Sequence, residues 1–286
     1  MTQAPYPAGR DGRASARHTP GTPCWVSLMV HDMTATQTFY GELFGWEFEP
    51  GPAQLGPYVR ARLDGRQVAG IGLLPPDRHL PVAWTPYLAS DDVDVTAETV
   101  RLCGGTVGVG PLDAGEVGRL VLGSDPSGAV FGVWQVPGER GGAAGGRPGA
   151  PLWNELRTFE TANVAKFYAS LFGYEERRPE PDSGGAGAGE EAADRVTLCL
   201  DGRPVAGILG AGPALRHDGG PHWLTYFEVA DTDAAVERLT GLGGRVVAPA
   251  QDTARGRTAT VADPEGARFA LLQRGGTGAD GRRAAG

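Results

Sequence analysis

The sequence predicts an α+β fold made of two tandem modules, each built from two similar units of one helix and several strands. Three observations lead to this fold class. Short motifs recur in the same order in both halves of the 286-residue chain, each half carries an Asp-Gly hairpin signal, and each half carries an aromatic helical stripe that ends at a glycine. A chain of this length favours about two domains.

The internal repeat sets the domain organisation. Trp25 and Phe39-Tyr40 match Trp153 and Phe167-Tyr168 at one constant offset. The Asp-Gly pairs match at a larger offset, so the second copy carries an insertion, which we assign to the tract 179–193. Because this many matches in one order do not arise by chance, the chain is interpreted as a duplication. The predicted divisions are a disordered N-terminal tail 1–22, module 1 at 23–136, a Gly-rich linker 137–150, module 2 at 151–274 and a disordered C-terminal tail 275–286.

Local patterns predict the elements of each module. The first segment of each copy alternates as a strand does. Asp32 or Thr34 can cap the helix that follows, and Thr161 can do so in the second copy. The apolar residues of the helix recur at i, i+4 spacing up to Gly45, which is typical of a glycine that ends a helix. The Asp125-Pro126-Ser127-Gly128 segment fits a type I turn, and we assign its carboxylate a structural role.

Composition and charge limit the function classes. The net charge is −8, and an acidic surface repels nucleic-acid phosphates, so no nucleic-acid partner is expected. Cys24, Cys103 and Cys199 show no C-x-x-C spacing and are typical of reduced, packed thiols in a cytoplasmic protein. No apolar run approaches about 18 residues and the N-terminus lacks a signal-peptide core, so we expect no membrane association.

Together these motifs resemble the vicinal oxygen chelate superfamily, which includes glyoxalase I, bleomycin-resistance proteins and extradiol dioxygenases. The resemblance rests on the F-Y-x-x-L-F-G-W/Y end of the first helix, the D-G-R-x-V-A-G-I hairpin strand at 64–71 and 201–208, and the D-P-x-G-A…F segment of each copy. The resemblance covers both copies, and it is greatest to the tandem two-module proteins of actinobacteria. It implies paired βαβββ units that form a curved, cup-shaped mixed sheet with helices on the outside. It also implies a monomer with an internal pseudo-dimer, or a homodimer.

The metal positions of the family can be compared with this chain. The resemblance places the first ligand at Trp25 and Trp153, and the third at Pro86 and Thr225. The second falls in the strands 58–63 and 195–200, which contain no His, Asp or Glu, and the fourth falls on Gly132 and Ala270. Because these side chains are not the usual ligands of divalent metals, we expect no metal and no cofactor.

The cup lining is the remaining candidate site. Strand alternation places Glu155 on the same face as Trp153, where a carboxylate among aromatic side chains needs a partner and is a candidate general acid or base. His222 is the second catalytic candidate. The structural alternative is that the aromatics only fill the cup or the module interface, and that Glu155 pairs with Arg157 or Arg60. The predicted ligand-binding residues are Trp25, Ser27, Met29, Arg60, Trp84, Trp134, Trp153, Glu155, Thr197, Trp223, Thr225 and Phe227.

These features lead to a functional hypothesis with two rivals. We expect a protein that binds a small aromatic or hydrophobic molecule in a metal-free cleft between the modules, for sequestration, resistance or an accessory role in metabolism. A cationic or hydroxyl-bearing ligand would suit only the pocket that holds Glu155. One rival is an enzyme: a glyoxalase-like lyase, an oxygenase, or a metal-independent isomerase or cyclase. The other is a protein-interaction module whose cup is vestigial.

Overall fold

The computed structural model describes residues 19–76, 81–136, 146–178, 194–212, 214–217 and 219–275. Most of the two predicted tails, of the linker and of the insertion lies outside these residues. The described part of the chain contains no helix that is long and apolar enough to cross a membrane.

Both modules have the same order of strands and long helices, and they differ only in short helical turns. Module 1 contains β1 Pro23–Val30, α1 Met33–Phe44, β2 Glu47–Pro50, the 3-10 turn η1 Ala53–Leu55, β3 Tyr58–Leu63, β4 Arg66–Leu73, β5 Trp84–Ala89, α2 Val93–Leu102, β6 Thr106–Asp113, η2 Gly115–Val117, β7 Arg119–Ser124 and β8 Val130–Gln135. Module 2 contains β9 Pro151–Thr158, α3 Thr161–Phe172, β10 Glu175–Arg177, β11 Arg195–Leu200, β12 Arg203–Gly210, the short α4 Ala214–His217, β13 His222–Glu228, α5 Thr232–Gly241, β14 Arg245–Thr253, β15 Gly256–Ala262 and β16 Arg268–Arg274.

Each module forms its own eight-stranded mixed sheet. The strand orders are β2-β3-β4-β1-β5-β8-β7-β6 and β10-β11-β12-β9-β13-β16-β15-β14, so the two sheets have identical topology. Within each sheet the two βαβββ units join through one antiparallel pair, β1 with β5 and β9 with β13. The predicted fold class of tandem α+β modules is therefore confirmed.

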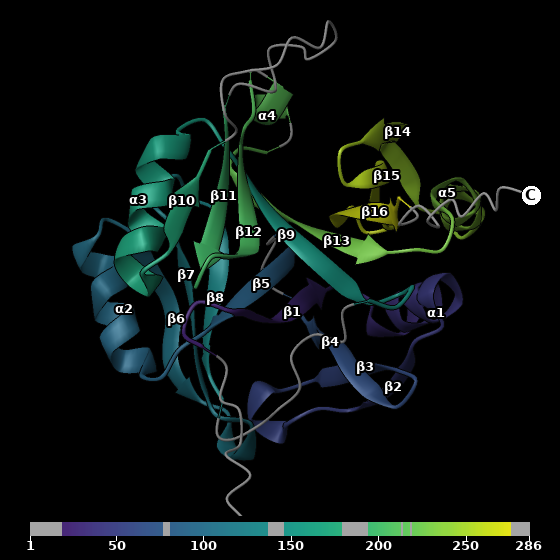
Figure 1. The fold of residues 1–286 in the computed structure, drawn as a ribbon. Helices are drawn as coiled ribbons and strands as arrows, with labels where there is room; N and C mark the ends of the chain where they lie inside the picture. The colour runs from purple at the N-terminus through teal and green to yellow at the C-terminus, as the bar shows by residue number, and fades with distance from the viewer. Residues whose placement is uncertain are drawn as a thin grey trace, which may run out of the picture.

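The helices of the two modules pair with each other. Helix α1 packs beside α5 and helix α2 beside α3, so each pair contains one helix from each module (Figure 1). Two large hydrophobic cores result, and both are shared. One joins Tyr40 and Phe44 of module 1 to Phe227 and Phe269 of module 2, and the other joins Phe131 of module 1 to the helix α3 side of module 2. Neither module therefore has a complete core of its own.

A buried hydrogen-bond chain crosses each shared core. The Tyr40 hydroxyl donates to Oδ2 of Asp263 in the other module at 3.0 Å, and it accepts from Nε1 of Trp84 at 3.0 Å. The second core repeats the chain: Tyr168 donates to Asp125 at 3.2 Å and accepts from Trp223 at 3.0 Å. Burial raises the pKa of both aspartates, and the surrounding hydrogen-bond donors oppose that rise.

The Asp-Pro turn holds its own carboxylate in place for this contact. Oδ1 of Asp125 accepts hydrogen bonds from the backbone N–H groups of Ser127 and Ala129 at 2.8 and 3.1 Å. Only Oδ2 is then left for Tyr168. The structural role predicted for this carboxylate is confirmed, and it includes a contact between modules that the turn motif alone does not reveal.

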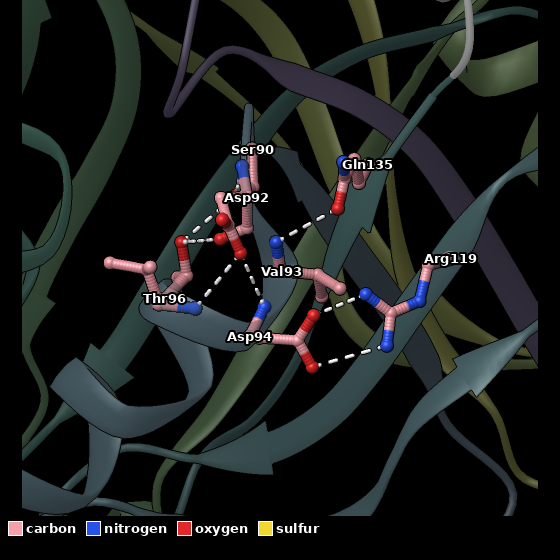
Figure 2. A network of polar contacts seen from close by, with 8 residues as sticks. Ser90, Asp92, Val93, Asp94, Thr96, Arg119 and Gln135 are labelled. Carbon is pink, nitrogen blue, oxygen red and sulfur yellow. Dashed lines mark hydrogen bonds and ion pairs between the residues drawn. The ribbon is translucent and has the colours of Figure 1, made fainter.

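The helix ends follow local sequence rules, with one exception. Asp32 caps α1, while Gly45 and Gly173 end α1 and α3 in the left-handed conformation at φ 73° and 71°. In α2, Asp92 caps the helix, Gln135 of β8 accepts from the Val93 N–H, and Asp94 forms an ion pair with Arg119 (Figure 2). Thr161 does not cap α3, because it is already the first helical residue and its hydroxyl donates to Asp194 at 2.5 Å.

We predict that Tyr40→Phe lowers the free energy of unfolding of the whole chain by about 2–4 kcal/mol. The substitution leaves Asp263 and Trp84 buried without this partner, and each unsatisfied group costs about 1–3 kcal/mol. Urea unfolding is the measurement. The control is Tyr87→Phe, whose hydroxyl accepts one bond from Ser27 at the wall of a cavity and should cost less than about 1 kcal/mol. Equal losses of unfolding free energy in the two variants would contradict the role assigned to the buried hydrogen bonds that cross the cores.

Candidate functional site

The sheet of module 1 holds a cavity of about 770 Å³ on the face opposite its helices. Its walls come from β1, from β3 to β8 and from the turns η1 and η2, and every lining residue belongs to module 1. We name this cavity the first cup. This cavity lies within module 1, whereas the predicted cleft lies between the two modules.

Aromatic rings form the walls of the first cup. The rings of Trp25 and Trp134 meet edge to face at a centroid distance of 5.7 Å. Nε1 of Trp25 donates to the hydroxyl of Tyr58 at 3.0 Å, and the Ser27 hydroxyl donates to that of Tyr87 at 3.2 Å. Since each phenol oxygen accepts one bond, its own proton is left to donate elsewhere.

Two glycines allow these phenol rings to lie across the sheet. A Cβ added at Gly70 would stand 1.7 Å from the Tyr58 hydroxyl, and one at Gly132 would stand 2.2 Å from Cδ1 of Tyr87. Both distances are far inside van der Waals contact. Gly70, the second glycine of the D-G-R-x-V-A-G-I motif, therefore has a role in the cup as well as in the fold.

Burial keeps the two phenols and the thiol of the first cup protonated. It raises the pKa of Tyr58 well above that of a free phenol, raises the pKa of Tyr87 as well, and raises the pKa of the Cys24 thiol to about 12. The two phenols are therefore hydrogen-bond donors at neutral pH, and Cys24 is a neutral thiol.

The corresponding face of the module 2 sheet, which we name the second cup, is charged. Glu155 is 2% exposed and accepts hydrogen bonds from the Tyr226 hydroxyl at 3.0 Å and from Nη1 of Arg195 at 3.1 Å. Nε of Arg157 lies 4.0 Å from the same carboxylate. The guanidinium of Arg255 lies over the Trp153 ring, 4.1 Å from its centroid. Positive side chains thus outnumber the one carboxylate.

The two cups differ because equivalent positions carry different residues. The repeat aligns Ser27 with Glu155, Met29 with Arg157, Tyr58 with Arg195 and Val117 with Arg255. Sequence reasoning found Glu155 but missed Tyr58, Tyr87, Arg195, Tyr226 and Arg255. Alignment of the two copies strand by strand carries a signal at Tyr58, Arg195 and Arg255, since a charged residue in one copy replaces an uncharged one in the other. It carries none at Tyr87 and Tyr226, which are equivalent and identical.

Four predicted ligand-binding residues lie on the other face of their strands. Trp84 and Phe227 belong to one shared core and Trp223 to the other, and Thr225 is fully buried with its hydroxyl bonded to Asn154. The prediction that these four side chains line a cup is therefore wrong. On β5 and β13 the residues opposite Trp25 and Trp153 are Tyr87 and Tyr226, and this pairing register is not readable from the sequence.

The other predicted residues lie on the cup faces. Trp25, Ser27, Met29, Arg60 and Trp134 line the first cup. In the second cup Trp153 lies beside Glu155, and Thr197 pairs with Gly207, which in turn pairs with Glu155.

The surroundings of His222 and the ion-pair partners of Glu155 are the remaining points to compare with the predictions. His222 lies opposite Arg157 on β13, and its Nδ1 is 2.8 Å from the Gly220 carbonyl oxygen. Glu155 pairs with Arg195 and lies near Arg157, both within module 2, whereas Arg60 pairs with Glu49 at 3.2 Å in module 1.

The residues of the cups do not fit the divalent metal that the fold family commonly uses. At the position of the fourth family ligand, the Tyr87 ring occupies the space beside Gly132 that a ligand side chain would need. The described residues contain no group of three or more His, Cys, Asp or Glu side chains placed to hold a metal ion. We therefore derive no chemical step through a metal.

We predict that Cys24 resists alkylation by iodoacetamide in the folded protein. With a pKa of about 12, only about one thiol in ten thousand is ionised at pH 8, and the thiolate is the reactive form. Cys103 is partly exposed and serves as the internal control. Peptide mass spectrometry should find Cys103 labelled first, with Cys24 labelled only in denaturant. Early labelling of Cys24 that rises between pH 7 and 9 would disprove this assignment.

Comparisons with known proteins agree with this fold. A family described as Glyoxalase-like domain matches residues 155–272. The Mycobacterium tuberculosis glyoxylase-like protein CFP32 is 35% identical over 259 residues, covering 88% of this chain and 95% of that protein. The anthracycline biosynthesis protein DnrV of Streptomyces peucetius is 36% identical over 276 residues, with 90% and 94% covered.

Solved structures show the same architecture. The Mn(II)-bound glyoxalase of Novosphingobium aromaticivorans superposes with a TM-score of 0.59 at 18% identity, covering 89% of this chain and 82% of that chain. The 2,3-dioxygenase LapB of Pseudomonas sp. KL28 gives 0.61 at 15% identity, with 90% and 94% covered. From the repeat, the paired βαβββ units and these relatives together, the chain belongs to the glyoxalase-like proteins of the vicinal oxygen chelate superfamily.

Proposed function

We propose that this protein binds a small, flat, hydrophobic organic molecule in the first cup, without a metal ion. The proposed role is sequestration, resistance or an accessory step in metabolism. The observation that carries the proposal is the pairing of aromatic walls with two phenol donors in a cavity of about 770 Å³. Ligand sites of this size are mainly apolar, with a few polar groups that fix the orientation of the ligand.

The donors favour one class of ligand. Tyr58 and Tyr87 each accept a bond from a neighbour and stay protonated, so both have an O–H to offer. A ligand with carbonyl or hydroxyl oxygens on a planar aromatic frame would accept these bonds while its rings contact Trp25 and Trp134. An aromatic ketone or quinone-type molecule fits this description.

Binding is favoured over turnover by the kinds of group in the cup. Among its described lining residues there is no Asp, Glu or His. Cys24 and the phenols lose their protons only far above neutral pH. A general base near pH 7 is therefore lacking among these lining residues, and general acid–base catalysis requires one.

The relatives support the proposal in different ways. DnrV carries a name that places it in anthracycline biosynthesis, which favours an aromatic polycyclic ligand. CFP32 carries a glyoxylase name, which favours the enzymatic rival. In that rival, Glu155 and His222 of the second cup are the acid–base candidates, although Tyr226 and Arg195 already hold the Glu155 carboxylate.

We predict that 1,8-dihydroxyanthraquinone, a neutral planar probe, quenches the tryptophan fluorescence of the chain with saturation in the micromolar range. Trp25→Phe should remove much of the quenching. Tyr58→Phe should weaken binding about tenfold, because a lost hydrogen bond in an apolar site costs about 1.4 kcal/mol. The matched control is Tyr226→Phe in the second cup, which should leave probe affinity unchanged.

Two outcomes would contradict the proposal. One is the absence of saturable quenching, which would favour an interaction module with a vestigial cup. The other is equal weakening by Tyr58→Phe and Tyr226→Phe, which would show that the probe does not distinguish the cups. Mass spectrometry of the probe after incubation separates binding from turnover, since binding alone leaves its mass unchanged.

A further inference from the structure

The second cup contains more positive charge than its own carboxylate can balance. Arg157, Arg195 and Arg255 lie around Glu155 on one face of the module 2 sheet. Two other acidic side chains of module 2 are engaged elsewhere. Asp194 lies 4.0 Å from Arg178 and accepts from Thr161, and Asp252 pairs with Arg257 at 3.3 Å.

Arg255 is the least satisfied of the three arginines. It lies at the tip of the β14–β15 hairpin, stacks on Trp153 and makes no side-chain hydrogen bond or ion pair within the described part of the chain. Burial lowers the pKa of Arg255 and the nearby Glu155 charge raises it, so the group is partly desolvated without a bonded counter-charge. A guanidinium in such a place has five N–H donors available.

Two buried donors in the same cup also lack acceptors. Nε1 of Trp153 and Nε of Arg157 are buried and have no hydrogen-bond partner among the described residues. In the first cup the equivalent indole of Trp25 donates to Tyr58, but Arg195 stands at that position in module 2. An oxygen acceptor is therefore missing where the first cup has a phenol, and an unpaired buried donor costs about 1–3 kcal/mol.

The unpaired donors and the excess charge point to the same kind of ligand. We propose that the second cup binds a small oxyanion, a carboxylate or a phosphate group, through Arg255, Arg157 and Arg195. The oxyanion takes hydrogen bonds from Arg255 and from Trp153 as the guanidinium turns from the indole ring to the ligand. Arginine forks suit both carboxylate and phosphate, because they donate two parallel bonds.

Glu155 competes with that ligand in this arrangement. Its carboxylate already takes the bonds of Arg195 and Tyr226, so it acts as an internal anion and limits the affinity for an external one. The cup therefore prefers anions, contrary to the cationic ligand expected from Glu155 alone. This site is independent of the first cup and of the function proposed for it.

The test is isothermal titration of the whole chain with inorganic phosphate and, separately, with succinate, against sodium chloride at matched ionic strength. We expect saturable binding of at least one oxyanion, weakened tenfold or more by Arg255→Gln. Glu155→Gln should strengthen binding about tenfold. The charge-matched control, Arg101→Gln on the exposed side of α2, should stay within twofold of the wild-type affinity. Preference between the two probes distinguishes a phosphate ligand from a carboxylate ligand.

The site does not exist as proposed if neither oxyanion binds beyond the chloride baseline, or if Arg255→Gln and Arg101→Gln bind equally well. Unchanged or weaker binding in a folded Glu155→Gln protein would overturn the competition by Glu155. Because Arg255 lies at a hairpin tip, its variant decides the question even if Glu155→Gln fails to fold. Difference fluorescence between the chain and Trp153→Phe gives a second readout, since departure of Arg255 changes the surroundings of this indole.

Discussion

The buried hydrogen bond from a helix tyrosine of one module to the turn aspartate of the other is the constraint on which the rest of the structure depends. Tyr40 and Tyr168 can reach Asp263 and Asp125 only if α1, besides its own sheet, packs against that of module 2 and α3 likewise packs against that of module 1. Buried polar groups must be paired, so these bonds fix the relative position of the modules. The aromatic residues around them then complete both cores.

This arrangement separates stability from binding. The helix-facing side of each sheet is committed to a shared core, while each hydrophobic cluster on the opposite faces draws its described residues from a single module. The two cup faces have therefore been free to diverge after duplication. One has become an aromatic cavity with two phenol donors, and the other a cluster of arginines around Glu155. Fold alone does not determine such differences, because function lies in the residues placed on it.

Much of the fold is predictable from the sequence, because the duplicated motifs are local. Gly45 and Gly173 end their helices, and the hairpins lie at the Asp-Gly pairs, as expected from backbone preferences. The short edge strands β2 and β10 were missed, since four and three residues give too little alternation to detect. The sharing of each core between the two modules could not be predicted from local patterns. It depends on contacts between residues more than 200 positions apart in the sequence, such as Tyr40 with Asp263.

The site was harder to predict, because its residues depend on strand register. Trp84 and Trp223 suit an aromatic pocket by type, yet each is the donor to a core tyrosine. A one-residue difference in parity exchanges the two faces of a strand, so Tyr87 and Tyr226 occupy the cups instead. The three arginines of the second cup come from two separate strands and a hairpin tip, and only the folded sheet brings them together.

The most direct test of the claim that one fold carries two unlike cups is a crystal structure of the chain grown with both 1,8-dihydroxyanthraquinone and phosphate. The account predicts the planar probe against Trp25 and Tyr58 in module 1, and phosphate beside Arg255 and Trp153 in module 2. Both molecules in the same cup, or the probe in the second cup with the first one closed, would contradict it.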